Sequence, residues 1–217
     1  MRLRHARIEL ELHELSQRGG PALLLLHAVG GSSADWSEAA ALWPGSVYAL
    51  DFCGHGRSQW VRGAVYYPEL LAADADAALA QLGPAAVAGA GLGAYVALLL
   101  AGGRREQVRA ALLLPGRGLA GGGGEPNFDR PLAEALSPDP NAPLPAGCDP
   151  YVGAMERDPR PPDYAAHFAG AARRLLLLED GDERPPWWTA VRQARSARVV
   201  GGDVRSSLSD LAFECRG

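Results

Sequence analysis

Short apolar runs divide the chain at regular intervals. Residues 22–26 read Ala-Leu-Leu-Leu-Leu, and similar runs recur at 47–50, 86–88, 110–114, 175–178 and 197–200. A continuous apolar run of this length is typical of a strand that is buried on both faces of a parallel sheet. The segment from Ala6 to Leu15 instead alternates apolar and polar residues. That alternation predicts a half-exposed strand at the edge of the sheet.

Helical patterns lie between these strands. In residues 68–82 the apolar positions recur at helical spacing, and Gly83-Pro84 then stops the pattern. Residues 92–101 and 186–194 are the next helices that the pattern predicts. Strands that alternate with helices predict an α/β fold with a mostly parallel, doubly wound sheet flanked by helices. In such a fold, ligands bind beyond the carboxyl ends of the strands.

One stretch rich in Gly and Pro, residues 115–162, breaks this rhythm. Loops of this length inside a domain are usually lids or binding loops. We therefore expect a single domain over residues 1–217, with residues 115–162 forming an irregular cap inserted into it.

Composition excludes several classes of function. The net charge is −4, and no block of Lys and Arg is long enough to suggest a nucleic-acid surface. No apolar run approaches the roughly 20 residues of a membrane span, and no apolar segment typical of a signal peptide follows Met1. The three cysteines are too far apart for a CxxC metal site. We expect a cytoplasmic protein without metal, cofactor, nucleic-acid or membrane partner, and its oligomeric state stays open.

Three turn motifs carry a resemblance to a known superfamily. Residues 26–33 read Leu-His-Ala-Val-Gly-Gly-Ser-Ser, residues 51–58 read Asp-Phe-Cys-Gly-His-Gly-Arg-Ser, and residues 89–93 read Gly-Ala-Gly-Leu-Gly. In this order they resemble the His-Gly turn, the D-x-x-G-x-G-x-S turn and the nucleophile elbow G-x-S-x-G of the esterase-like and lipase-like α/β hydrolases. The resemblance covers nearly the whole chain, and it implies the α/β-hydrolase fold.

The resemblance also implies where the site lies. Gly91 stands at the position of the nucleophile, and the backbone N–H groups of Val29 and Leu92 would form the oxyanion hole. The residues expected to line a pocket beside them are His27, Ala28 and Gly30.

Two further positions complete the comparison with a catalytic triad. The acid would follow the strand at 175–178, where Asp182 is the best candidate, and Asp203 stands where the histidine is expected. Triad order in this fold is nucleophile, acid, base, and none of the five histidines follows Asp182. An aspartate with an ordinary pKa of about 4 is a poor general base at neutral pH.

These departures predict a degenerate member that lacks both the nucleophile and the base. Glycine has no side chain that could attack a carbonyl, and loss of the nucleophile or the base in a serine protease lowers kcat by about a millionfold. The sequence therefore predicts an inactive pseudo-hydrolase that binds a small ligand or a protein partner.

Alternatives remain open from the sequence. The chain could be an ester hydrolase after all, or an enzyme of altered mechanism that uses Asp182, Asp203 or Cys53. Residues Gly89–Ala94 also fit the dinucleotide fingerprint G-x-G-x-x-G/A, although no acid ends the following strand, and an anion at this helix N-terminus is a related possibility. Trp187-Trp188 could be an exposed anchor for a partner or could pack onto the sheet.

Overall fold

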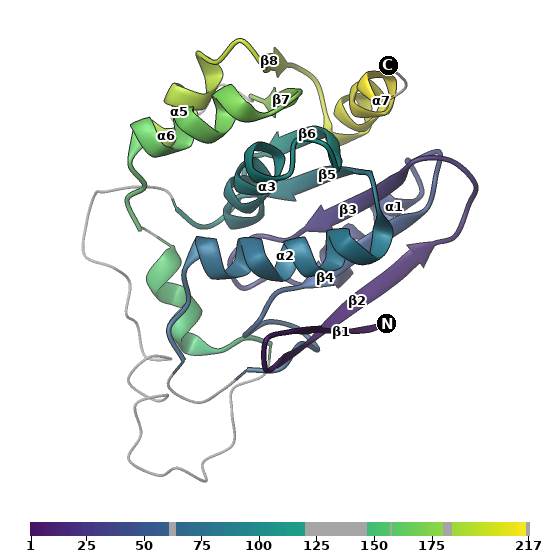
Figure 1. Cartoon of the computed structure of the whole chain (residues 1–217), viewed down its shortest axis with the longest axis vertical. Coiled ribbons are helices and arrows are strands. Elements are labelled where there is room, and N and C mark those ends of the chain that lie inside the picture. Colours follow the sequence, from purple (N-terminus) through teal and green to yellow (C-terminus); the bar gives the residue numbers. More distant parts are fainter. Residues whose placement is uncertain (61–63, 120–146, 157, 180–183, 216–217) are drawn as a thin grey trace, which may run out of the picture.

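An eight-stranded sheet forms the centre of the molecule (Figure 1). The computed structural model describes residues 1–60, 64–119, 147–156, 158–179 and 184–215. The strand order is β1-β2-β4-β3-β5-β6-β7-β8, and the strands from β4 to β8 in that order run parallel. The bounds are β1 (Arg2–His5), β2 (Ile8–Ser16), β3 (Ala22–Leu26), β4 (Val47–Asp51), β5 (Ala85–Ala90), β6 (Val108–Leu114), β7 (Leu175–Leu178) and β8 (Ala197–Val200).

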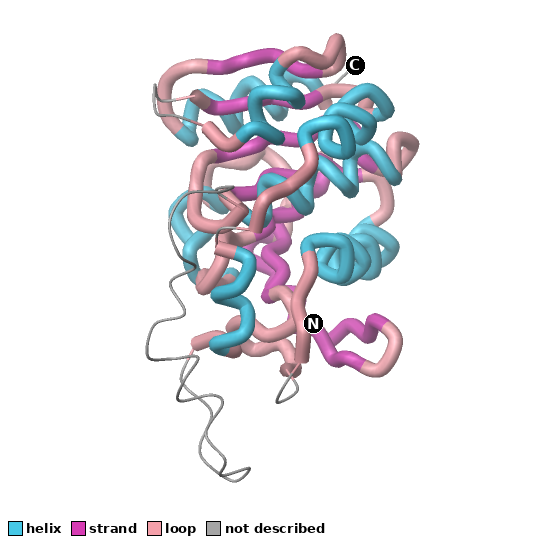
Figure 2. Tube along the Cα trace, turned by 90° about the vertical axis from the view of Figure 1, so that its left-hand side faces the viewer, coloured by secondary structure: helices cyan, strands magenta, loops and turns pink. Residues whose placement is uncertain are grey.

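Helices cover both faces of this sheet (Figure 2). One face packs against α2 (Pro68–Leu82), α3 (Leu92–Gly103), α5 (Pro162–Ala171) and α6 (Pro186–Arg192). The other face packs against η1 (Ser33–Trp36), α1 (Ser37–Ala40) and α7 (Val204–Glu214). The predicted mostly parallel sheet flanked by helices is therefore confirmed. No helix in the described part of the chain is both long and apolar enough to span a membrane.

The prediction that residues 6–15 form the edge of the sheet was wrong. The edge is β1, which folds back antiparallel on β2, and β2 lies between β1 and β4. The chain reverses at Ala6 and Arg7, where Ala6 has a φ of 52°. Such tight turns usually carry Asn or Gly, so Ala-Arg gave no turn signal in the sequence. The partial exposure of β2 comes from its polar face rather than from an edge position.

The described parts of residues 115–162 contain one short helical element, η2 (Pro150–Met155), and a single bridge between His55 and Cys148. Only Pro162, the first residue of α5, belongs to the same stretch, and the sequence did not predict that helix. Residues 120–146 and 157, which make up most of the expected cap, lie outside the described residues.

Candidate functional site at Gly91

Gly91 alone makes the turn from β5 into α3. Its φ is 54° and its ψ is −114°, and its N–H donates to the carbonyl oxygen of Leu114 at 3.0 Å. A positive φ is free for glycine and strained for residues with a Cβ. The predicted sharp strand-to-helix turn with positive φ at residue 91 is confirmed.

The space above Gly91 is filled by the chain itself. The backbone N–H groups of Val29 and Leu92 both donate to the carbonyl oxygen of Arg117, at 3.2 Å and 2.9 Å. A Cβ built on Gly91 would lie 2.1 Å from that same oxygen and 2.6 Å from the carbonyl carbon of Gly116. The oxygen of Arg117 therefore lies between the two N–H groups that the resemblance assigns to an oxyanion hole, and it can do so because residue 91 has no side chain.

Residues 116–119, which we call the plug segment, pack closely against Val29 in the turn that follows β3. Gly118 has a φ of 104°, and a Cβ there would lie 2.5 Å from Cγ2 of Val29. The Arg117 side chain points outward and pairs with Glu156, Nε to Oε1, at 3.0 Å. This pair is mostly exposed, so the backbone packing and not the ion pair holds the segment in place.

Leu119 anchors the far end of the plug segment. Its side chain is fully buried, and its N–H donates to the carbonyl oxygen of Met155 at 2.7 Å. Its own carbonyl oxygen accepts a hydrogen bond from Nε1 of Trp187 at 2.9 Å. Trp187 and Trp188 are both buried, so the hypothesis of an exposed tryptophan anchor for a partner was wrong.

His27 does not offer a free ring nitrogen to a ligand. Its Nε2 accepts the N–H of Phe52 at 3.1 Å, so the proton lies on Nδ1, which donates to the carbonyl oxygen of Ala28 at 2.7 Å. Burial lowers the pKa of His27 to about 4. The ring is neutral and structural. Gly30 is exposed, and a Cβ there would lie 3.9 Å from Nη1 of Arg117.

Asp203 is an exposed helix cap. Its carboxylate accepts the N–H of Ser206 at 2.8 Å, and its own backbone N–H donates to Oγ of Ser206 at 3.0 Å, which closes a capping box at the start of α7. The hydrogen bond from the backbone N–H of Ser206 lowers the pKa of Asp203 further. A general base needs the opposite shift. Asp182, the candidate acid, lies outside the described residues.

Solved structures place this arrangement among known folds. A hydrolase from Pseudomonas aeruginosa superposes with a TM-score of 0.72 at 18% identity, covering 99% of this chain and 95% of that one. A thermophilic esterase from Thermogutta terrifontis gives a TM-score of 0.69 at 19% identity, covering 100% and 94%. The chain has the α/β-hydrolase fold. No family model matches its sequence, and no curated protein is significantly similar to it.

A third solved structure of similar fold belongs to a protein with a different activity. The bottromycin epimerase BotH, in complex with bottromycin, gives a TM-score of 0.64 at 19% identity and covers 100% of this chain and 96% of that chain.

Asp51 ties two turns of this α/β-hydrolase fold together. Its carboxylate accepts the N–H groups of Arg57 at 2.8 Å and Ser33 at 2.7 Å, and it contacts Nε2 of His13 at 3.0 Å. Burial works to raise its pKa, but these hydrogen bonds hold the pKa below its ordinary value. The D-x-x-G-x-G-x-S motif therefore has a structural explanation that requires no catalytic role.

The structure argues against Cys53 and the loop Gly89–Ala94 as alternative sites. Burial and the neighbouring acids Asp74 and Asp149 raise the pKa of the Cys53 thiol to about 12, so it is not a nucleophile at neutral pH. The N–H of Leu92 at the N-terminus of α3 already donates to the carbonyl oxygen of Arg117, so it is not free to bind a dinucleotide or an anion. Across the described ranges, no group of three His, Cys, Asp or Glu side chains could hold a metal ion.

The plug is the feature that sequence reasoning missed. Residues 115–118 read Pro-Gly-Arg-Gly directly after β6, which indicates a turn but does not say what the turn contacts. The contact with Gly91 joins segments that are 26 positions apart, and only the fold brings them together.

Proposed function

We propose that this chain is a non-catalytic protein of the α/β-hydrolase fold, a pseudo-hydrolase that binds a small ligand or a protein partner. One observation carries the proposal. The carbonyl oxygen of Arg117 accepts both N–H groups where the oxygen of an ester would have to lie, directly above a residue without a side chain.

The chemistry of acyl transfer explains why this observation matters. The reaction needs a nucleophile, a base that activates it, and hydrogen-bond donors that are free to receive the developing negative charge. Gly91 supplies no nucleophile, and the N–H groups of Val29 and Leu92 already have an acceptor. A substrate would have to displace that acceptor, at about 1 kcal/mol for each hydrogen bond, before any chemistry began.

The fold itself does not require hydrolysis. Folds of this kind host unrelated activities, and function depends on the site. The epimerase among the structural neighbours supports this separation of fold from activity. A binding function would use surfaces other than the space directly above Gly91, because the backbone of Gly116 and Arg117 fills that space.

Hydrolysis of p-nitrophenyl acetate at neutral pH tests the proposal. We expect the purified chain to release p-nitrophenol no faster than a non-enzymatic protein of similar size. A fluorophosphonate probe, which labels activated serines, should label a control esterase and not this chain. Saturable turnover that survives repurification would overturn the proposal. If that turnover were lost in Asp182→Asn but kept in Asp203→Asn, it would identify an enzyme of altered mechanism.

A further inference from the structure

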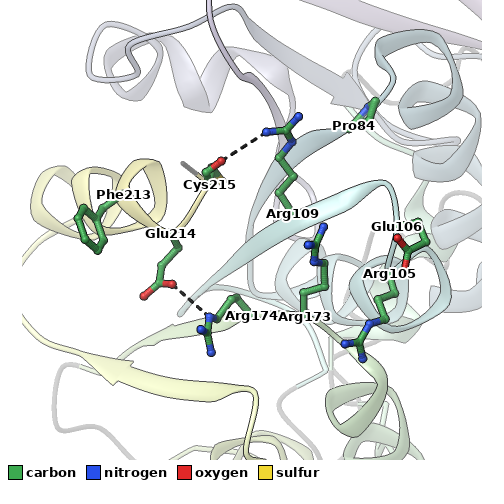
Figure 3. A pocket seen from close by; sticks show the side chains of 9 residues that line it. All are labelled: Pro84, Arg105, Glu106, Arg109, Arg173, Arg174, Phe213, Glu214 and Cys215. Atoms are coloured by element: carbon green, nitrogen blue, oxygen red, sulfur yellow. Dashed lines mark hydrogen bonds and ion pairs between the residues drawn. The ribbon is translucent and has the colours of Figure 1, made fainter. Parts of the chain in front are cut away.

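Four arginines gather at the end of the sheet opposite Gly91. Arg105, Arg109, Arg173 and Arg174 line a pocket of about 800 Å³ (Figure 3). Arg105 and Arg109 flank the start of β6, and the adjacent pair Arg173 and Arg174 directly precedes β7. The pocket therefore lies at the amino ends of these parallel strands, whereas Gly91 follows the carboxyl end of β5. The six residues of β5 separate the two ends by about 20 Å.

The protein neutralises these cations only in part. Nε of Arg174 pairs with Glu214 at 3.2 Å, and Arg109 makes a long hydrogen bond of 3.5 Å to the carbonyl oxygen of Cys215 (Figure 3). Arg105 donates to the carbonyl oxygen of Ala171 at 3.2 Å. Within the described part of the chain, Arg173 has neither a hydrogen bond nor an ion pair.

The charges leave a local positive excess. Four arginines face two carboxylates, those of Glu106 and Glu214, around the pocket. The whole chain has a net charge of −4, so this cluster opposes the overall balance. Like charges that are gathered this closely repel one another unless an anion lies among them. The arrangement fits a ligand that brings negative charge.

We propose that this pocket binds a compact ligand that carries more than one phosphate group. The planar guanidinium group of arginine donates two parallel hydrogen bonds to phosphate oxygens, which makes it well suited to this recognition. The volume lies within the range of about 300–1,000 Å³ that small-molecule sites occupy. A compact ligand fits better than a long polyanion, because Glu106 and Glu214 border the pocket and the surrounding protein is acidic overall.

Calorimetric titration with inorganic tripolyphosphate tests the site. We expect saturable binding with one ligand per chain at low salt. The double variant Arg109→Gln/Arg173→Gln should bind about tenfold more weakly or worse, because it removes two charged donors that make little contact with the protein. Thermal unfolding of the variant should match that of the parent, which separates lost binding from lost structure.

The matched control removes the same charge elsewhere. Arg4 and Arg7 are exposed in the β1–β2 hairpin at the far edge of the sheet, and Arg4→Gln/Arg7→Gln should leave the affinity within about twofold. A parallel titration with ATP distinguishes the two sources of phosphate. If the natural ligand is a nucleotide, ATP should bind more tightly than tripolyphosphate. If it is a free polyphosphate, ATP should bind no more tightly than tripolyphosphate.

Three results would overturn the proposal: no saturable binding at low salt, an equal loss of affinity in both double variants, or tighter binding of a DNA oligonucleotide than of tripolyphosphate. None of them depends on whether the site at Gly91 is inactive, so this proposal and the proposed function can fail separately.

Discussion

At the scale of single residues, glycine at position 91 meets two separate requirements. The backbone there has a φ of 54°, and the oxygen of Arg117 lies where a Cβ would be. The neighbour that would be struck is main chain, so it cannot rotate away as the end of a flexible side chain could. Any other residue type has a Cβ and therefore conflicts with both requirements.

Gly91→Ala should therefore be costly. We expect a loss of roughly 2–4 kcal/mol in the free energy of unfolding, about 1 from the strained φ and the rest from the forced displacement of Arg117. Urea unfolding measures it. Gly170→Ala is the matched control, because it lies in α5 with no atom within 4 Å of an added Cβ, and it should stabilise by up to about 1 kcal/mol. Equal stability of parent and Gly91→Ala would contradict the close approach.

Restoring catalytic side chains should not restore catalysis. Gly91→Ser places its Cβ against Arg117 as alanine would, and Asp203→His replaces an exposed helix cap. We expect neither single variant nor the double variant to hydrolyse p-nitrophenyl acetate above the parent. Saturable turnover in the double variant alone would mean that the plug segment yields easily, since nucleophile and base act as a unit.

At the scale of elements, Trp187 links α6 to the plug segment. Its Nε1 donates to the buried carbonyl oxygen of Leu119 at 2.9 Å. Trp187→Phe leaves that oxygen without its donor, and we expect a loss of about 1–3 kcal/mol. The substitution should also accelerate amide hydrogen exchange at Val29 and Leu92, the donors to Arg117. The acceleration there should exceed that at Ala88, a residue in a central strand. Acceleration that is uniform across these three amides would indicate general destabilisation instead.

The sequence predicts elements well where burial requires a clear run or a clear periodicity of apolar residues. The all-leucine run of β7 and the periodic α2 were predicted with the bounds that the structure has. The sequence of α7 gave no such signal, because three serines dilute a narrow buried stripe of Leu208, Leu211 and Ala212. Asp203 was consequently interpreted as the position of a lost histidine and not as the cap of a helix. The turn at Gly91 is local and could be predicted, whereas the plug depends on packing between distant segments.

At the scale of the whole molecule, two buried histidines couple stability to pH. Burial lowers the pKa of His27 to about 4 and that of His55 to about 3. Below about pH 6.5 these two histidines take up protons in the unfolded chain but stay neutral in the native state. The free energy of unfolding therefore falls as the pH falls from 6.5 toward 4. We expect a loss on the order of 2 kcal/mol for each histidine between about pH 7.5 and about pH 5.

Urea unfolding at both pH values checks this expectation. His27→Gln should flatten the pH dependence, and His167→Gln, which alters an exposed histidine on α5, should leave it unchanged. Burial raises the pKa of Asp74, which works in the opposite direction, and comparison of the variants cancels that contribution. The same slope in all three proteins would show that His27 titrates normally.

The carbonyl oxygen of Arg117 also fixes the order in which mutations could create an active site here. A serine at position 91 is harmful while the plug segment stays in place, so it offers nothing that selection could favour. A change that moves residues 116–119 away must come first, and on its own it exposes two N–H groups without any benefit. This is sign epistasis, in which the value of one mutation depends on another. A laboratory evolution library built on this chain would have to vary residue 91 and the plug segment together.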